Sequence, residues 1–196
     1  NKIVGSNVSF TLFDFFGPMA GAFLGPVFGI ASVLGVELVN LFIKHTPLTT
    51  GSIIRLFPTL FAVYYFAVIT KKGNRNRWIL AVPILCILAF IAHPIGRQVF
   101  YYALLFWSIP LVAYIKKDNL FIKALGATFT AHAVGGAAWI WAFNLPAAVW
   151  NGLIPVVITE RLLFATGIAA SYIVVKYTLA FLAAKKILPR LDIATS

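Results

Sequence analysis

Long apolar runs separated by short polar stretches follow one another along the whole chain. Runs of about 20 residues recur, the length of a helix that crosses a bilayer core of about 30 Å. The runs are continuous and lack the period-two alternation of transmembrane strands. We therefore expect an all-α polytopic membrane protein with about six spans, one or two of them broken or re-entrant, in a single domain over residues 1–196. The expected segments are 10–43, 54–70, 78–95, 99–115, 121–144 and 153–184.

The last segment, 153–184, is too long for one perpendicular span, since it would reach roughly 48 Å as a helix. A shorter span over 162–183 fits the bilayer and leaves Glu160 and Arg161 at its outer mouth. Residues 145–158 (LPAAVWNGLIPVVI) contain two prolines, which interrupt the backbone hydrogen bonds of a helix. We therefore expect this stretch to form a separate interfacial or re-entrant piece.

The first segment, 10–43, is expected to break at one of its Gly-Pro pairs, at 17–18 or at 25–26. A complete hairpin there would move the N-terminus to the other side of the membrane. The chain starts at Asn1 without an initiator methionine, and its single methionine is Met19. We therefore expect the N-terminus to be incomplete and the helix count to be a minimum.

Composition supports the membrane interpretation. Hydrophobic residues make up 61% of the chain and charged residues 11%, and the mean hydropathy is +0.94. Soluble domains carry roughly 25% charged residues, so this chain must face lipid rather than water. The single cysteine, Cys86, excludes an intramolecular disulfide.

The net charge of +11 would indicate nucleic acid as a partner if the protein were soluble. Here the basic residues sit mostly between apolar runs, where they orient a protein against the cytoplasmic leaflet. Loops 71–77 and 116–123 and the tail after 184 are rich in Lys and Arg, whereas 44–53, 96–98 and 145–152 hold only Lys44 and Arg97. We expect a multi-pass protein of the cell (inner or plasma) membrane, with both termini cytoplasmic, in contact with lipid and not with nucleic acid.

Polar residues from five segments fall near the membrane side that lacks basic loops. They are Glu37, Asn40, Arg55, His93, Arg97, Trp139, Trp141, Asn144, Glu160 and Arg161. A charge at a helix centre costs at least about 2.5–3.5 kcal/mol and persists when it is paired or lines a cavity. We therefore expect an outward-facing ligand pocket with aromatic walls. Its surplus arginine favours a carboxylate or phosphate on the ligand.

Two alternatives to a pocket stay open at this stage. Arginine and tryptophan also serve as anchors at headgroup depth, which explains Arg97 equally well. Glu160 and an arginine could form a structural ion pair. His132 lies deeper than the other residues, near the expected midplane.

Four glycines at every fourth position, Gly17, Gly21, Gly25 and Gly29, form one smooth stripe on a helix. Small residues at this spacing let another helix backbone approach closely. The stripe fits either internal packing against a neighbouring helix or a docking face for another subunit.

Enzyme motifs are incomplete in this sequence. The run AHAVGG at 131–136 resembles the histidine-bearing helix of rhomboid proteases, but the Gly-x-Ser-Gly nucleophile of that chemistry is missing. The three histidines are far apart in sequence and form no metal-binding motif, so only a metal site assembled from separate helices stays open. There is also no phosphate-binding loop or haem motif. We expect no enzymatic activity, no catalytic residue, no cofactor and no bound metal.

The stretch FTLFDFFGPMAGAFLGPVFGIASVLGVELVN, residues 10–40, resembles the early Gly-Pro region of the substrate-binding S components of energy-coupling factor (ECF) vitamin transporters. Those are small six-helix membrane proteins of about this size. The resemblance implies a vitamin-like ligand bound in the outer halves of the helices. It also implies docking of the glycine stripe onto a transmembrane T component, with two cytoplasmic ATPases as further partners.

Together these features favour the small-molecule-binding subunit of a membrane importer, with the ten polar residues as its ligand site. The second hypothesis is a structural or accessory subunit of a larger membrane complex. In that case the glycine stripe packs against a partner and the polar residues form an interfacial ion-pair network.

Overall fold

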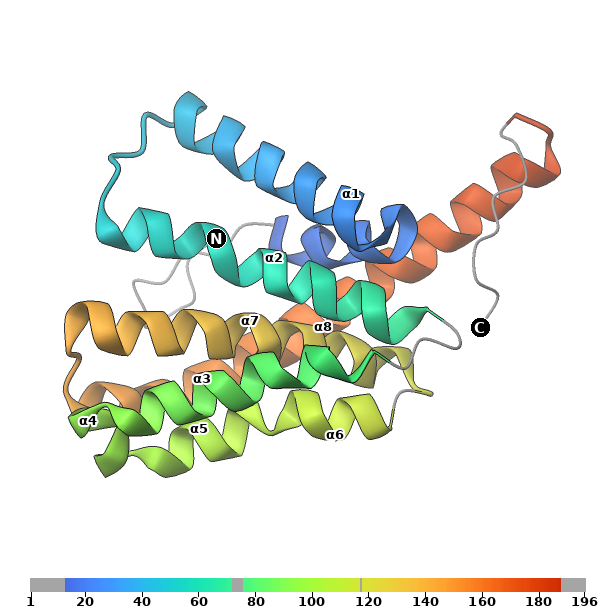
Figure 1. Ribbon diagram of the computed structural model, residues 1–196. Coiled ribbons are helices and arrows are strands. Elements are labelled where there is room, and N and C mark those ends of the chain that lie inside the picture. Colours follow the sequence, from blue (N-terminus) through green and yellow to red (C-terminus); the bar gives the residue numbers. More distant parts are fainter. Residues whose placement is uncertain (1–12, 72–75, 117, 188–196) are drawn as a thin grey trace.

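The computed structural model describes residues 13–71, 76–116 and 118–187, and nearly all of this part is helical (Figure 1). The helices are α1 (Phe13–Ile43), α2 (Thr50–Thr70), the short 3-10 helix η1 (Arg77–Leu80), α3 (Ala81–Ala92), α4 (Pro94–Gln98), α5 (Phe100–Trp107), α6 (Ile109–Ile115), α7 (Leu120–Phe143) and α8 (Ala147–Ala184). These elements follow the predicted apolar segments closely, and no strand occurs in the described ranges. The expected all-α class is confirmed.

Helix α1 reverses direction in its middle, at Gly25. The φ and ψ angles of this residue are 79° and 171°, a region that essentially only glycine adopts. Gly29 then lies against the backbone of Gly21, because a Cβ on Gly29 would come within 2.7 Å of the Gly21 Cα. Eight residues apart in a straight helix, the two would be about 12 Å apart. The predicted break therefore exists, at the second of the two Gly-Pro pairs (Figure 1).

Helix α8 is continuous over 38 residues, which is about 57 Å. The expectation that 145–158 forms a separate piece is therefore wrong. Pro155 stands inside the helix and removes one backbone hydrogen bond without ending it. Trp150 and Val157, on either side of this proline, are buried in the same hydrophobic cluster, so packing on both sides holds the two turns in line.

Helix α7 lies at the centre of the bundle and packs against α2, α3, α5, α6 and α8, while α1 packs against α2 and α8 (Figure 1). Small residues on α7 make these close approaches possible. A Cβ on Gly126 would come within 2.6 Å of the Tyr65 hydroxyl, and one on Gly136 within 2.5 Å of the Trp107 ring. Because α7 packs against five other helices, it can carry glycines, threonines and a histidine in place of large apolar side chains.

Within the described residues, three helices are long and apolar enough to cross a membrane. They are Phe15–Ile43, Thr50–Thr70 and Ala147–Ala184. The segments expected at 78–95 and 99–115 appear as the shorter apolar helices Arg77–Ala92 and Phe100–Ile115. Prolines divide this region, since Pro94 begins α4 and Pro110 lies in the first turn of α6. The membrane class is thus supported, and the count of six spans is not confirmed.

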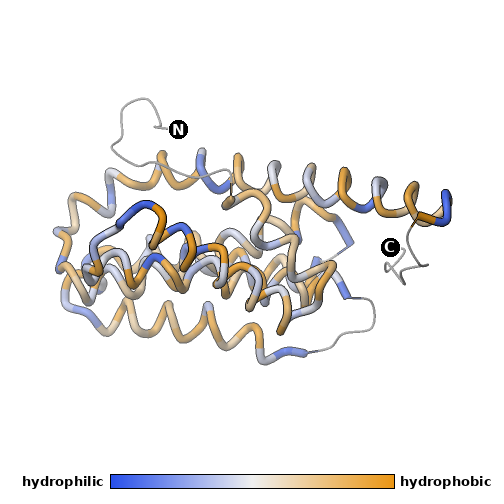
Figure 2. Tube along the Cα trace, turned by 90° about the horizontal axis from the view of Figure 1, so that it is seen from above, coloured by the Kyte–Doolittle hydropathy of each residue, from blue (hydrophilic) through white to orange (hydrophobic). Residues whose placement is uncertain are grey.

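Many of the charged residues that the structure describes lie toward the two ends of the bundle. Figure 1 places the α1–α2 connection, α4 and the α7–α8 connection at one end. The other end, called the basic end below, carries Lys71, Arg77, Lys116, Lys123, Lys185 and Lys186. Figure 2 shows apolar residues along most of each helix and hydrophilic ones mainly near the helix ends. This separation of apolar bodies from charged ends is the pattern expected of helices in a bilayer.

Candidate functional site

A buried ion pair occupies the middle of α8. The Nη2 atom of Arg161 lies 3.3 Å from the Oε2 atom of Glu160. Only 7% of Glu160 is exposed, so its carboxylate is removed from any solvent outside the bundle. The second carboxylate oxygen, Oε1, is also buried and has no hydrogen-bond partner among the residues that the structure describes. The Nε atom of Arg161 is likewise buried without a hydrogen bond to the described residues. Buried polar atoms are normally satisfied, so these two atoms of the pair call for an explanation.

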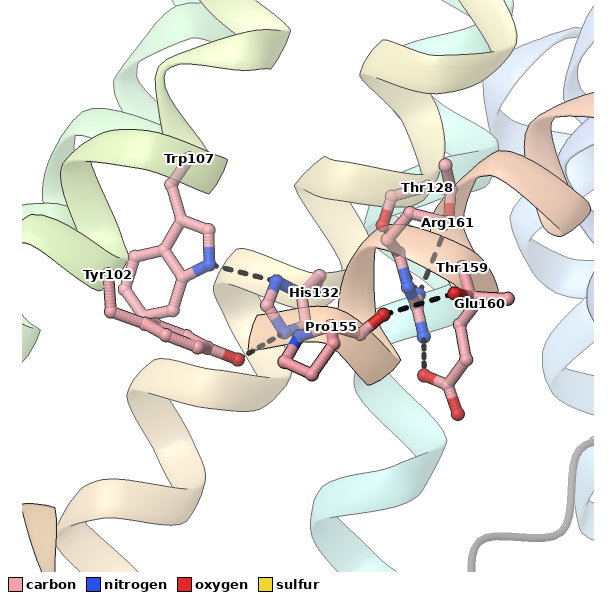
Figure 3. Close-up of polar contacts among 8 residues, drawn as sticks. All are labelled: Tyr102, Trp107, Thr128, His132, Pro155, Thr159, Glu160 and Arg161. Atoms are coloured by element: carbon pink, nitrogen blue, oxygen red, sulfur yellow. Dashed lines mark hydrogen bonds and ion pairs between the residues drawn. The ribbon is translucent and has the colours of Figure 1, made fainter. Parts of the chain in front are cut away.

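Arg161 reaches from α8 to the central helix α7 (Figure 3). Its Nη1 atom donates to the hydroxyl of Thr128 at 3.2 Å and to the Thr128 carbonyl at 3.5 Å. The guanidinium carbon also lies 4.6 Å from the centroid of the Phe164 ring, a cation–π contact. The ion pair is therefore fixed to two helices, and Arg161 makes several of the contacts that a buried guanidinium requires.

A second polar group surrounds His132 on α7. The indole Nε1 of Trp107 donates to the His132 Nδ1 at 3.1 Å, and the His132 Nε2 lies 3.1 Å from the hydroxyl oxygen of Tyr102. An indole N–H is only a donor, so Nδ1 must be the acceptor and the ring is neutral with its proton on Nε2. The Nε2–H then donates to Tyr102, whose own hydroxyl proton remains available for a further acceptor.

The two groups meet on one face of α7, because Thr128 and His132 are four residues apart. Together, Tyr102, Trp107, Thr128, His132, Glu160 and Arg161 form what is called the central polar band below (Figure 3). The band lies deep in the bundle. Glu160 is about 20 Å along α8 from its first residue, and His132 stands midway along α7.

An aromatic layer lies beside the band. The ring of Phe90 is 5.0 Å from that of Trp107, 4.9 Å from that of Trp150 and 6.1 Å from that of Tyr102. All four side chains are essentially buried. Tyr102 and Trp107 are thus packed ring against ring, and both contact the polar group on α7 through His132.

Most of the other predicted residues gather at the end opposite the basic end. The His93 Nε2 lies 2.8 Å from the Asn144 Oδ1, and the His93 Nδ1 accepts from the backbone of Ile95. Asn144 ends α7 in the left-handed conformation. Trp141 stands edge-on to His93 and donates to the carbonyl of Ala89. These contacts tie the end of α7 to the turn between α3 and α4.

The remaining predicted residues lie around this group. Arg55 is exposed, with its guanidinium 5.8 Å from the Trp139 ring centroid. Arg97 is exposed and donates over 3.5 Å to the carbonyl of Ala92. Glu37 and Asn40 are half-buried on the part of α1 that follows the kink at Gly25. The structure therefore brings together His93, Trp141 and Asn144, and separately Glu160 and Arg161.

The expectation that all ten polar residues lie near the same side of the membrane needs correction for Glu160 and Arg161. Arg161 bonds to Thr128, which is about 22 Å along α7 from its end at Phe143. Glu160 and Arg161 were expected at an outer mouth because residues 145–158 were taken as separate from the span. Since α8 already begins at Ala147, the pair lies more than three turns into the helix.

Sequence reasoning did not select Thr128, although a signal for it was present. The run GATFTAH at 126–132 places a threonine and a histidine four residues apart inside an apolar segment. Two polar side chains at this spacing share one helix face and so indicate a polar partner on a neighbouring helix.

The glycine stripe packs inside the chain. A Cβ on Gly17 would come within 2.9 Å of the Thr59 side chain, and one on Gly21 would overlap the carbonyl oxygen of Val63. Gly25 is the hinge residue of α1, and nothing lies within 4 Å of an added Cβ there. The internal-packing alternative thus accounts for Gly17, Gly21 and Gly29, and a role in docking a partner stays a prediction.

Metal ligands are not clustered in the part of the chain that the structure describes. No group of three or more His, Cys, Asp or Glu side chains there lies close enough to hold a metal ion. His93 and His132 belong to the two separate groups described above. Each of these rings already contacts protein groups through both of its nitrogen atoms.

Comparisons with known proteins give one informative match. The chain is 28% identical over 189 residues to an uncharacterized protein of Methanocaldococcus jannaschii, an alignment that covers 88% of this chain and 62% of that protein. The chain therefore spans less than two thirds of that relative's length. No protein-family model matches the chain. No solved structure matches it either.

Proposed function

We propose that the chain is a solute-binding integral membrane protein, the small-molecule-binding subunit of a membrane importer. The observation that carries this proposal is the buried Glu160–Arg161 pair with its unsatisfied Oε1 atom. Ionisable groups inside a membrane bundle are costly and mark substrate or ion pathways as a rule. As for S components of ECF transporters, the partners would be a transmembrane T component and ATPases that drive uptake of a vitamin-like molecule.

The contacts of the ion pair indicate what the ligand must offer. Arg161 already interacts with Glu160, Thr128 and Phe164, so its charge is compensated within the protein. Within the described residues, the pair presents two buried atoms that make no hydrogen bond, the acceptor Oε1 of Glu160 and the donor Nε of Arg161. We therefore infer a small polar ligand that offers a hydrogen-bond donor or a protonated nitrogen to the Oε1 atom of Glu160.

Native mass spectrometry of the chain, extracted gently from its own membrane, tests this function. We expect the wild type to carry a small molecule and Glu160→Gln to lose at least about 90% of it, because a neutral amide attracts a donor less strongly than a carboxylate does. Asp118→Asn serves as the control, since it neutralises an exposed acid outside the central polar band and outside the ten predicted ligand-site residues. A wild type without any bound molecule, or equal occupancy in all three proteins, would contradict the proposal.

A structural or accessory role in a larger membrane complex is the second candidate. The last turns of α8 diverge from the bundle in Figure 1. Their apolar side chains are largely exposed, at 64% for Val174, 69% for Tyr177 and 60% for Phe181. Such a helix arm suits contact with a neighbouring membrane subunit. Recovery of the chain with unrelated membrane subunits at a fixed ratio, and without a ligand, would favour this candidate.

We further propose that the basic end faces the cytoplasm, because Lys and Arg concentrate there. The C-terminal end of α8 is then cytoplasmic. The expected position of the N-terminus falls on residues 1–12, outside the described residues.

Cysteine labelling in intact cells measures this orientation. In a chain whose single cysteine has been removed by Cys86→Ala, we expect a membrane-impermeant maleimide to label Lys44→Cys and to spare Lys185→Cys. Both lysines are exposed, at opposite ends of the bundle. Permeabilised cells, in which both positions should react, provide the control. Labelling of the second variant alone in intact cells would reverse the orientation.

A further inference from the structure

A cavity of about 180 Å³ opens at the basic end, between the C-terminal end of α2, the N-terminal end of α7 and α8. It lies outside the central polar band. Its polar lining comes from Thr70, Asp118, Lys123, Tyr172, Lys176 and Tyr177. Thr70 is the last residue of α2, and Lys123 stands in the first turns of α7, so the cavity lies where helices leave the membrane.

Several contacts hold the floor of this cavity in place. The ring of Tyr172 stacks on that of Phe23 at 5.1 Å and stands edge-on to that of Phe66 at 5.9 Å. Lys176 follows Tyr172 by one helical turn, so both side chains lie on the same face of α8. The cavity wall is therefore fixed by side chains from α1, α2 and α8.

The charge of the lining favours an anion. Lys123 and Lys176 are both half-buried and exceed the single acid, Asp118, by one positive charge. The surrounding basic end adds further positive charge from lysines and arginine outside the cavity. Basic pockets between helices on the cytoplasmic side are the type of site that binds phosphate-bearing headgroups.

Part of the cavity lining is also exposed on the outside of α8. Ile173 and Tyr177 line it and are 45% and 69% exposed. Both belong to the part of α8 whose apolar side chains are largely exposed on the outside of the bundle. An occupant can thus place a charged group between the two lysines and an acyl chain along α8, a combination that a phospholipid offers and free phosphate does not.

We propose that this cavity binds the phosphate of an anionic phospholipid, with Lys123 and Lys176 as the two cationic contacts. The acyl chains of that lipid lie along the outer face of α8. Free phosphate shares the charged part of this chemistry, so the test must separate the two sources.

The proposal is tested on the full chain by native mass spectrometry from detergent with added lipid. Phosphatidylglycerol and phosphatidylcholine with identical acyl chains are compared, and inorganic phosphate alone is the third probe. We expect one tightly held phosphatidylglycerol on the wild type. The double variant Lys123→Ala/Lys176→Ala should bind it about 25-fold more weakly, at roughly fivefold for each lysine.

Two further variants make the result specific to the cavity. Lys185→Ala/Lys186→Ala removes the same number of charges from the same end but outside the cavity, and should change binding less than about twofold. Lys123→Arg/Lys176→Arg keeps the charge and should retain the lipid even if the alanine variant folds poorly. Equal losses in both alanine variants, or no preference for phosphatidylglycerol over phosphatidylcholine, would overturn the proposal. Competition by inorganic phosphate at equal concentration would overturn the assignment to lipid.

Discussion

Arg161→Met is expected to lower the free energy of unfolding by about 3–5 kcal/mol, the usual cost of removing one member of a buried ion pair. The substitution leaves Glu160 buried without the guanidinium that lies 3.3 Å from its Oε2 atom. The other oxygen of that carboxylate already lacks a hydrogen-bond partner among the described residues. Unfolding in detergent micelles titrated with dodecyl sulfate, followed by circular dichroism, gives the free energy.

The double variant Glu160→Met/Arg161→Met decides whether the loss comes from the pair. Replacing a whole buried pair by apolar side chains of similar size is often close to neutral. We therefore expect the double variant to be more stable than Arg161→Met alone. If both variants lose the same free energy, the two side chains act independently and the pair is not the source of the effect.

The same double variant separates stability from function. A folded double variant that no longer carries the small molecule bound by the wild type would assign the pair to ligand binding. A double variant that keeps both the fold and the bound molecule would assign it to neither role.

Helix positions were predictable because hydropathy reports directly on contact with lipid. The segments 54–70 and 121–144 differ from α2 and α7 by only a few residues at their ends. The hinge of α1 was also predictable, since a Gly-Pro pair combines a flexible residue with one that lacks an N–H. The expectation that failed is that the two prolines in residues 145–158 separate this stretch from the following helix. Pro155 stays inside α8 because the turns around it are both anchored in the core.

The central polar band could be predicted only in part. Depth was estimated from the ends of the segments, so the error at residues 145–158 moved Glu160 and Arg161 to the membrane surface. Which helix faces meet depends on the rotation and tilt of each helix, and a single sequence does not report these. The contact between Thr128 and Arg161 joins residues 33 positions apart, and it depends on the rotation and the tilt of α7 and α8.

Gly21→Ala is expected to destabilise the isolated chain by roughly 3 kcal/mol, at the upper end of the range for overpacked sites. A Cβ there would overlap the carbonyl oxygen of Val63 and lie 3.1 Å from the Cβ of Ala67. A backbone carbonyl cannot turn aside as a flexible side chain can, so α1 and α2 must move apart. Gly29, which packs on the backbone of Gly21, would be displaced with them.

Gly35→Ala is the matched control. Gly35 lies in the same helix, after the kink at Gly25, and nothing is within 4 Å of a Cβ added there. Alanine has the higher helix propensity, so this variant should be as stable as the wild type or slightly more stable. Thermal unfolding in detergent compares the three proteins. The result also bears on the docking hypothesis. A stripe reserved for a partner would tolerate Gly21→Ala in the isolated chain and fail only on assembly, whereas internal packing requires the loss to appear with no partner present.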